Sequence, residues 1–272
     1  MALPLPGSLT PSKVTAFKNC GLAFRYSAID RLVEPPSLPA LKGTVVHRAL
    51  QLLFDAPPEQ RTHALALQAL DIAIPEITGS SEYGDMEIDE PSSTLLRSDS
   101  EKLIERYFEL EDPTQVMPVG LELMLEAEIG GVFIRGIIDR LDLSADGELI
   151  VTDYKTGRAP NERFEQGSLN GVHFYAYLCE AVFGHRPAKV QLLYLSQPVS
   201  IVSVPTDQSI KGMERKVGAI WKAVEQACDR EDFRPNPSKL CDWCSFQSLC
   251  PAFGGEPATG LLDNRQIPLA IS

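Results

Sequence analysis

The spacing of apolar residues predicts helices towards both ends of the chain and strands in its middle. Near the N-terminus, Thr10 fits an N-cap and precedes Pro11, which opens a short helix toward Cys20. Apolar residues then recur every three or four positions, the period of an amphipathic helix, in five further stretches. These stretches are Gly43–Phe54, Glu59–Ile74, Ser93–Leu110, Glu162–Phe183 and Asp207–Asp229.

The middle of the chain has the composition of strands. Val, Ile and Leu dominate three stretches separated by Gly130-Gly131 and Asp146-Gly147, dipeptides that favour tight hairpin turns, so three successive antiparallel strands are expected. Two more strands follow the next helix. The five strands are predicted at Leu121–Ile129, Val132–Leu143, Glu148–Tyr154, Lys189–Ser196 and Ser200–Val204. Helices around a strand meander and a returning strand indicate an α/β core with a mixed sheet.

Composition and charge narrow the class of protein. The 272 residues are 44% hydrophobic and 23% charged, as in ordinary globular proteins. No apolar run approaches the roughly 20 residues that cross a bilayer, and residues 1–10 lack a charged signal-peptide start, so we expect a cytoplasmic protein without a membrane partner. The net charge of -12 argues against a polyanionic partner, but residues 82–112 alone hold 11 acidic and 3 basic residues, which is typical of a solvated face. Bulk acidity therefore does not exclude DNA.

Two neighbouring strands carry the candidate chemistry. In a strand of period two, Asp153 and Lys155 point to the same face, and Asp139 on the preceding strand can lie within a few ångströms of them. Such residues form a surface ion-pair ladder in many hairpins. Here both aspartates follow aliphatic or β-branched runs at the ends of expected core strands, where a carboxylate needs a partner or a metal. Two carboxylates there suit Mg²⁺ or Mn²⁺, and Lys155 could position or deprotonate water or stabilise charge on a phosphate.

The cysteines suggest a second centre. Cys241, Cys244 and Cys250 form C-x2-C-x5-C, and Cys20 stands more than two hundred residues earlier, whereas Cys179 and Cys228 fall within expected helices. Zinc fingers are usually local units, so this distribution favours a four-thiolate iron-sulfur site. A structural Zn²⁺ or four unliganded thiols remain open alternatives.

The site residues together resemble a known family. The pattern Asp139 followed by Asp153-Tyr154-Lys155 resembles the PD-(D/E)xK nuclease core, and Lys155-Thr156-Gly157 with Gly43-Thr44-Val45-Val46-His47 resembles its RecB branch. Ser12–Tyr26 is similar to the opening segment of that branch, and the resemblance covers nearly the whole chain. It implies a restriction-endonuclease-like fold and the following roles. His47, Asp139 and Asp153 would hold the metal, Lys155 would be the catalytic lysine, and Glu122 would match a further acidic position.

The resemblance also implies one nuclease domain over residues 1–272. It would comprise a helical part over 1–120 with an acidic loop at about 78–94, a catalytic sheet core over 121–205, and a helix with the cysteines over 206–272. The cysteine arrangement resembles the 4Fe-4S clasp of AddB-type and CRISPR-adaptation nucleases. Cys20, Cys241, Cys244 and Cys250 would then ligate a cluster that joins the chain ends, shielded by Trp243, Phe246 and Pro251.

The function expected from this resemblance is metal-dependent hydrolysis of DNA, as an exonuclease on single strands or ends in recombination, repair or foreign-DNA processing. Candidate DNA contacts are Arg140, Arg158, Tyr175, Lys211, Arg215 and Lys222, although a solvated face also explains the last three. The family places a glutamine four residues before the helix tyrosine; that position is Gly171 when counted from Tyr175, and His173, a partial substitute, when counted from Tyr177. No Walker A motif occurs, so unwinding would need a helicase subunit. The alternative is a non-catalytic DNA-binding or scaffold subunit of a helicase-nuclease complex that retains the fold and cluster.

Overall fold

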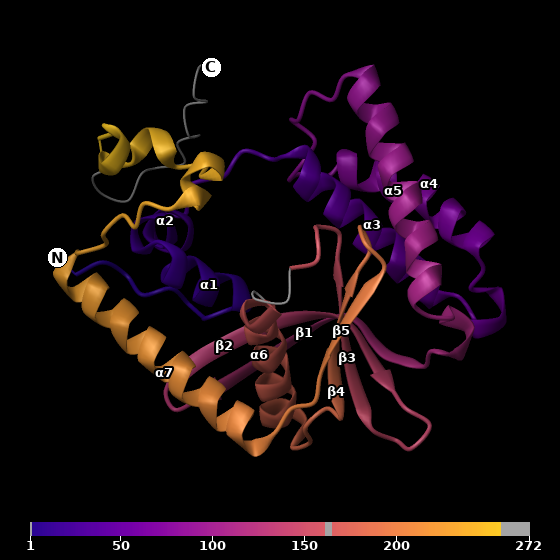
Figure 1. The fold of residues 1–272 in the computed structure, drawn as a ribbon. Coiled ribbons are helices and arrows are strands. Elements are labelled where there is room, and N and C mark those ends of the chain that lie inside the picture. Colours follow the sequence, from indigo (N-terminus) through magenta and orange to yellow (C-terminus); the bar gives the residue numbers. More distant parts are fainter. Residues whose placement is uncertain (1, 161–164, 257–272) are drawn as a thin grey trace. The chain divides into compact units, whose positions relative to one another are not determined.

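A five-stranded mixed sheet organises the middle of the chain in the computed structural model, which describes residues 2–160 and 165–256 (Figure 1). The strands lie in the order β1 to β5, with β2 antiparallel to β3, β3 parallel to β4 and β4 antiparallel to β5. Their bounds are β1 Pro118–Ile129, β2 Val132–Leu143, β3 Leu149–Lys155, β4 Lys189–Tyr194 and β5 Val199–Ser203. The predicted α/β fold with a mixed sheet is confirmed.

The helices match the apolar periodicity, and their caps explain where they begin. The Thr10 side chain accepts from the amide of Lys13, as predicted, while Ser37 caps α3 and Asp89 caps α5. Both caps start their helices earlier than the spacing indicates, so the acidic loop is shorter than expected. The helices are α1 Pro11–Asn19, α2 Gly21–Phe24, α3 Leu38–Asp55, α4 His63–Thr78, α5 Glu90–Leu110, α6 Glu165–Phe183 and α7 Asp207–Arg230.

Short helical turns join these elements. A π-helical turn, Arg25–Ile29, follows α2 directly. Single 3₁₀ turns span Pro58–Gln60 and Pro113–Gln115, and three more follow α7 at Lys239–Trp243, Gln247–Leu249 and Pro251–Phe253. No helix in the described ranges is long and apolar enough to cross a membrane.

The chain forms two compact units. Unit 1 consists of 1–35, 126–135 and 211–272, and unit 2 consists of 36–125 and 136–210. The strands β1 and β2 run through both units, which leaves the Gly130-Gly131 turn between them in unit 1. The interpretation of 1–272 as one nuclease domain stays a prediction.

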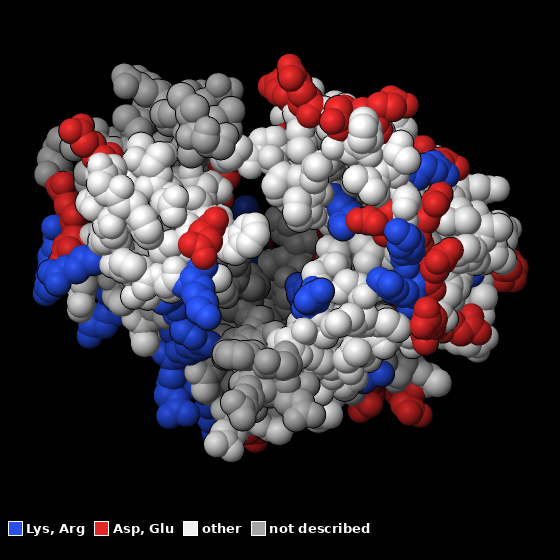
Figure 2. Space-filling model, turned by 45° about the horizontal axis from the view of Figure 1, so that its top comes forward, with Lys and Arg blue, Asp and Glu red and all other residues white. Residues whose placement is uncertain are grey.

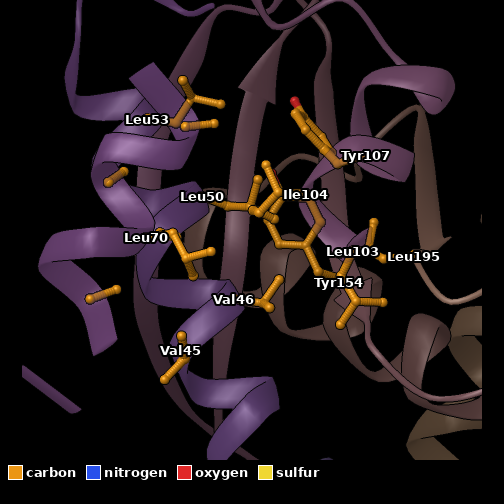
Figure 3. Close-up of a cluster of buried hydrophobic side chains, with 14 of the residues drawn as sticks. Val45, Val46, Leu50, Leu53, Leu70, Leu103, Ile104, Tyr107, Tyr154 and Leu195 are labelled. Carbon is orange, nitrogen blue, oxygen red and sulfur yellow. The ribbon is translucent and has the colours of Figure 1, made fainter. Parts of the chain in front are cut away.

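The core of unit 2 lies between its helices and one face of the sheet. Val46, Leu50 and Leu53 of α3 are fully buried, and they pack in one cluster with Tyr154 and Leu195 from the sheet region (Figure 3). Two glycines allow close approach of helix and strand. A Cβ at Gly43 would lie 3.3 Å from Thr156 Oγ1, and one at Gly136 would lie 3.1 Å from atoms of Tyr175 and Leu178 on α6. Thus α3 and α6 are seated against the strand ends that hold the acidic residues.

In unit 1 the N-terminal segment contacts the segment that follows α7. The amide of Leu22 donates to the carbonyl of Arg234 at 3.2 Å, and the Tyr26 hydroxyl donates to the carbonyl of Leu249 at 3.1 Å. The Tyr26 ring also packs on Phe246, with ring centroids 5.5 Å apart. These two segments, far apart in the sequence, are therefore in direct contact, while their joining by an iron-sulfur cluster stays a prediction. Basic side chains gather along the exposed face of α7 (Figure 2).

Candidate metal centre

The site lies where the ladder between β2 and β3 stops. The last paired residues are Arg140 and Thr152. Beyond them, the amide of Tyr154 donates to Asp139 Oδ2 at 2.7 Å, and the carbonyl of Tyr154 lies 3.2 Å from His47 Nε2. Because a carbonyl oxygen can only accept, Nε2 carries the proton and Nδ1 keeps its lone pair. The backbone of one β3 residue thus holds one side chain from α3 and one from β2.

The free nitrogen of His47 faces two carboxylates. Its Nδ1 lies 3.5 Å from Asp139 Oδ2 and 4.0 Å from Glu122 Oε1. One ligand atom from each of these three residues lies within 4.8 Å of the other two, and among the described residues this is the group of His, Cys, Asp and Glu side chains spaced to hold one ion. An imidazole fixed through its other nitrogen, with two carboxylates, is a donor set that suits Mn²⁺ or Mg²⁺. The cluster fits a divalent cation.

Glu122 reaches this cluster through an irregular backbone. Its φ of 45° lies in the left-handed region, which non-glycine residues rarely adopt. On the two sides of Glu122 the exposed positions of β1 change parity, from Val119 before it to Met124 and Glu126 after it. Such a change is what a β-bulge produces, and bulges next to functional sites re-aim a side chain. The local strain therefore directs the Glu122 carboxylate toward His47.

Asp153 and Lys155 share a face of β3, as the period of the strand predicts. Lys155 Nζ lies 2.5 Å from Asp153 Oδ2, and their side chains are 44% and 6% exposed. Burial disfavours the ammonium, but the nearby carboxylates of Asp153 and Asp139 outweigh it and raise the pKa of Lys155. In the metal-free protein Lys155 is therefore a cation, suited to bind a phosphate rather than to deprotonate water.

The electrostatics of the cluster favour uptake of positive charge. Burial and then the charge of Asp153 raise the pKa of Asp139 well above its ordinary value. The same two causes raise the pKa of Glu122. Burial lowers the pKa of His47, so its imidazole is neutral at neutral pH and available as a ligand. Carboxylates that resist ionisation together are stabilised when a divalent ion replaces their protons.

Tyr175 on α6 belongs to the same site. Burial, followed by the charges of Asp153, Asp139 and Glu122, strongly raises the pKa of its hydroxyl. The Tyr175 ring lies against β2, because a Cβ at Gly136 would be 3.1 Å from one of its atoms, and its protonated hydroxyl can donate a hydrogen bond. Gly171, which replaces the family's glutamine one helical turn earlier, offers no such group.

The other predicted DNA contacts lie in different places. Arg158 is exposed just after β3, while Lys211, Arg215 and Lys222 are exposed on α7 of unit 1. The prediction that Arg140 contacts DNA is wrong. Arg140 is fully buried, and all five of its N–H donors have partners within the protein. Adjacent residues of a strand point to opposite faces, so Arg140 points away from the face of Asp139. It is not available to a phosphate.

A cleft beside the cluster contains a cation that the sequence analysis missed. It has a volume of about 530 Å³ and is lined mainly by α3, with His47 and Glu122 at its edge and Arg48 and Gln51 in its wall. The Arg48 guanidinium is oriented by Gln51 Oε1 at 2.8 Å and Glu76 Oε2 at 3.0 Å. The sequence feature that could have indicated Arg48 is its position directly after His47.

The four predicted cluster cysteines line one cavity of about 230 Å³ in unit 1. Burial and then the other three thiols raise the pKa of Cys244, because negative charges there would repel one another. The six cysteines do not form a group at the spacing of ligands to one ion within the described residues. Phe246 and Trp243 both line this cavity; Phe246 is buried, whereas Trp243 is 86% exposed.

Comparisons with known proteins agree with this geometry. The model of the PD-(D/E)XK nuclease superfamily matches residues 8–251. The Gene 69 protein of Mycobacterium phage D29 is 26% identical over 270 residues, which cover 89% of this chain and 96% of that protein. The Gene 69 protein of Mycobacterium phage L5 is 29% identical over 137 residues, 49% of this chain and 44% of that protein. A candidate exonuclease from Eubacterium rectale shares the fold with a TM-score of 0.55 at 12% identity, covering 87% of this chain and 86% of that one.

Proposed function

Because this chain belongs to the PD-(D/E)XK nuclease superfamily, we propose that it is a Mg²⁺- or Mn²⁺-dependent deoxyribonuclease that acts as an exonuclease on single strands or ends. The observation that carries the proposal is the convergence of His47, Glu122 and Asp139 beside the Asp153–Lys155 ion pair. Nuclease chemistry needs a cation at the scissile phosphate and a polar group that positions water. This site supplies ligands for the cation and polar side chains that can position water.

Each residue has a role in this proposal. His47, Glu122, Asp139 and Asp153 would hold the metal, which when bound supplies Lewis-acid activation of the phosphodiester and of water. Lys155 lies beside Asp153 as an ammonium and stabilises the negative charge that builds on the phosphate oxygens. The Tyr175 hydroxyl, protonated among the carboxylates, donates a hydrogen bond to a bridging or non-bridging oxygen.

A 4Fe-4S cluster held by Cys20, Cys241, Cys244 and Cys250 is part of the proposal. Support comes from the single cavity that all four residues line and from the contacts that already bring the N-terminal segment to residues 234–250. Zn²⁺ would need four sulfurs around one ion, whereas the thiolates of a cubane cluster bind different irons and stand farther apart. The role of the cluster would be to stabilise unit 1.

The proposed substrate is DNA in recombination, repair or the processing of foreign DNA, in the cytoplasm. Arg158, Lys211, Arg215 and Lys222 are exposed cations that can contact its phosphates. A helicase subunit would supply any unwinding. The alternative is a DNA-binding scaffold without catalytic activity, which an experiment must distinguish from the nuclease.

Cleavage of end-labelled single- and double-stranded DNA by anaerobically purified protein tests the function. We expect cleavage with Mn²⁺ or Mg²⁺, none with EDTA, and a loss of at least about a hundredfold in Asp153→Asn, because a removed metal ligand leaves the site incompletely charged. Glu148→Gln, an exposed acidic change before β3, is the matched control and should keep full activity. If the wild type cleaves neither form of DNA but binds it, the scaffold role is correct.

Metal analysis of the same preparation tests the cluster. About four irons per chain and broad visible absorption, both lost in Cys244→Ser, would support it. A colourless protein that contains one zinc would refute the cluster. Cys179 is a buried thiol of α6 in unit 2, so Cys179→Ser is the control, and loss of iron and absorption in this variant would also refute the cluster.

A further inference from the structure

Arg140 and Tyr154 form a connection between the buried face of the sheet and the metal cluster. Tyr154 is 3% exposed, and its side chain points to the face of β3 opposite Asp153 and Lys155. Its hydroxyl accepts from Arg140 Nη1 at 2.7 Å. Its backbone, by contrast, binds Asp139 through the amide and His47 through the carbonyl. One residue therefore contacts a buried cation on one side and two candidate ligands on the other.

The Arg140 guanidinium is held rigidly. Nε donates to Asp142 Oδ1 at 2.8 Å, and Nη2 donates to Glu111 Oε2 at 3.0 Å and to Thr152 Oγ1 at 3.3 Å. Nη1 donates to Glu111 Oε1 and to the Tyr154 hydroxyl. Every N–H of the fork is used, which fixes both its position and its plane.

Aromatic rings complete the environment of the guanidinium. It lies 4.4 Å from the centroid of the Phe54 ring and 5.6 Å from that of Tyr154. The Tyr107 ring packs edge-on against Tyr154, with centroids 5.9 Å apart. The Tyr154 side chain is thus confined by packing as well as by its hydrogen bond, and its backbone has little freedom to move.

We propose that Arg140, acting through Tyr154, is a positioning device that sets the spacing of His47 and Asp139 for the metal. The inference rests on the proposed function, since it concerns the same ion. Metal ligands must be held within about 0.5 Å of their required positions. Mutation of the residues that hold the ligands in place changes metal affinity by about 10- to 100-fold. The ladder between β2 and β3 has ended at this point, while Tyr154 is still paired with Leu193 of β4 on the other edge of β3. The Tyr154 side chain therefore adds to this pairing in fixing the backbone that contacts His47 and Asp139.

Tyr154→Phe is the decisive variant because it removes only the oxygen that accepts from Arg140. We expect the Kd for Mn²⁺, measured by calorimetry without substrate, to rise about tenfold, the low end for groups behind metal ligands. Tyr107→Phe is the matched control. Its hydroxyl also accepts from Arg140 Nη1, at 3.5 Å, and donates to Glu111 at 2.6 Å, but its backbone lies in α5 and contacts neither His47 nor Asp139 in the hydrogen bonds of the site. It should lose similar thermal stability and keep the wild-type Kd.

A second measurement needs no metal. The imidazole nitrogen signals of His47, assigned with His47→Ala, should show the Nε2-protonated tautomer in the wild type and a mixture of tautomers in Tyr154→Phe. An unchanged tautomer together with an unchanged Mn²⁺ affinity would overturn the inference, as would an equal loss in Tyr107→Phe, because equal loss means general loosening. If the wild type binds no Mn²⁺, the metal-nuclease proposal fails, and the tautomer measurement alone decides the positioning role.

Discussion

Replacing Asp139 by asparagine should stabilise the metal-free protein while removing its response to metal. Asparagine has the same shape, and its carbonyl oxygen can still accept from the amide of Tyr154, where Asp139 Oδ2 accepts at 2.7 Å. The atom nearest to Nδ1 of His47, at 3.5 Å, is this same oxygen, so the amide nitrogen of the variant takes the position of Oδ1. The substitution therefore removes a buried charge and keeps the local hydrogen bonds.

The magnitude follows from the geometry of the cluster. Ligand atoms of Asp139 and Glu122 lie within 4.8 Å of each other. Two ionised carboxylates at that distance repel by about 3.5 kcal/mol at an effective dielectric constant of about 20. Proton uptake relieves part of this repulsion, so a gain of about 2 kcal/mol is expected for Asp139→Asn in EDTA at pH 8. That gain corresponds to about 4–8 °C in melting temperature.

The pH dependence has a definite sign. Because burial and Asp153 raise the folded-state pKa of Asp139 above its ordinary value of 3.8, the folded protein binds this proton more tightly than the unfolded chain. Ionisation of Asp139 therefore lowers the free energy of unfolding as the pH rises from about 4 through the folded-state pKa. The advantage of Asp139→Asn should be small near pH 4 and largest at pH 8.

Thermal unfolding followed by circular dichroism, in EDTA and in Mn²⁺, measures both effects. At a Mn²⁺ concentration one hundred times Kd, the wild type should gain about 2.7 kcal/mol and overtake the variant, which should gain little. A variant that is less stable than the wild type in EDTA at pH 8 would refute the electrostatic reasoning. Equal stabilisation of both proteins by Mn²⁺ would show that Asp139 is not a ligand.

Three further predictions concern single cations of unit 2. Arg140→Met should lower the free energy of unfolding by about 3–5 kcal/mol in urea titrations, because it leaves the partly buried Glu111 and the buried Asp142 without their cation; a loss below 1 kcal/mol would contradict this. Lys155→Met should reduce kcat by about a hundredfold without weakening Mn²⁺ binding in calorimetry, because the ammonium acts on the phosphate; weakened binding would instead make Lys155 part of the metal site. Arg48→Gln should raise KM for DNA about tenfold with kcat unchanged, because the cleft contact is made equally in ground and transition states, whereas Arg97→Gln on α5 should change neither.

The strand chemistry was predictable because strands have a short, strict period. Asp139 and Asp153 were placed together by alternation and by the apolar runs before them, and the register of β2 and β3 agrees. The same rule could have placed Arg140 on the opposite face, where its burial makes it a structural residue.

Other parts of the site could not be derived from local patterns. Glu122 enters the cluster only because its backbone adopts a φ of 45°, which alternation cannot reveal. His47 is one of four histidines, and its role was indicated by resemblance rather than by helical spacing. Its actual position depends on the close approach of α3 to β3 at Gly43 and on a backbone carbonyl, both of which are tertiary features.

The distribution of charge connects these features to the substrate. Unit 2, which holds the metal cluster, has 25 acidic and 12 basic residues, whereas unit 1 has 12 acidic and 13 basic residues. The unit that would cut DNA therefore carries a net negative charge that opposes phosphate binding, and three carboxylates converge at its site. A bound divalent ion removes that local barrier, while the near-neutral unit 1 with its basic α7 adds none. Metal loading would thus control access of the phosphate backbone to the site as well as the chemistry performed there.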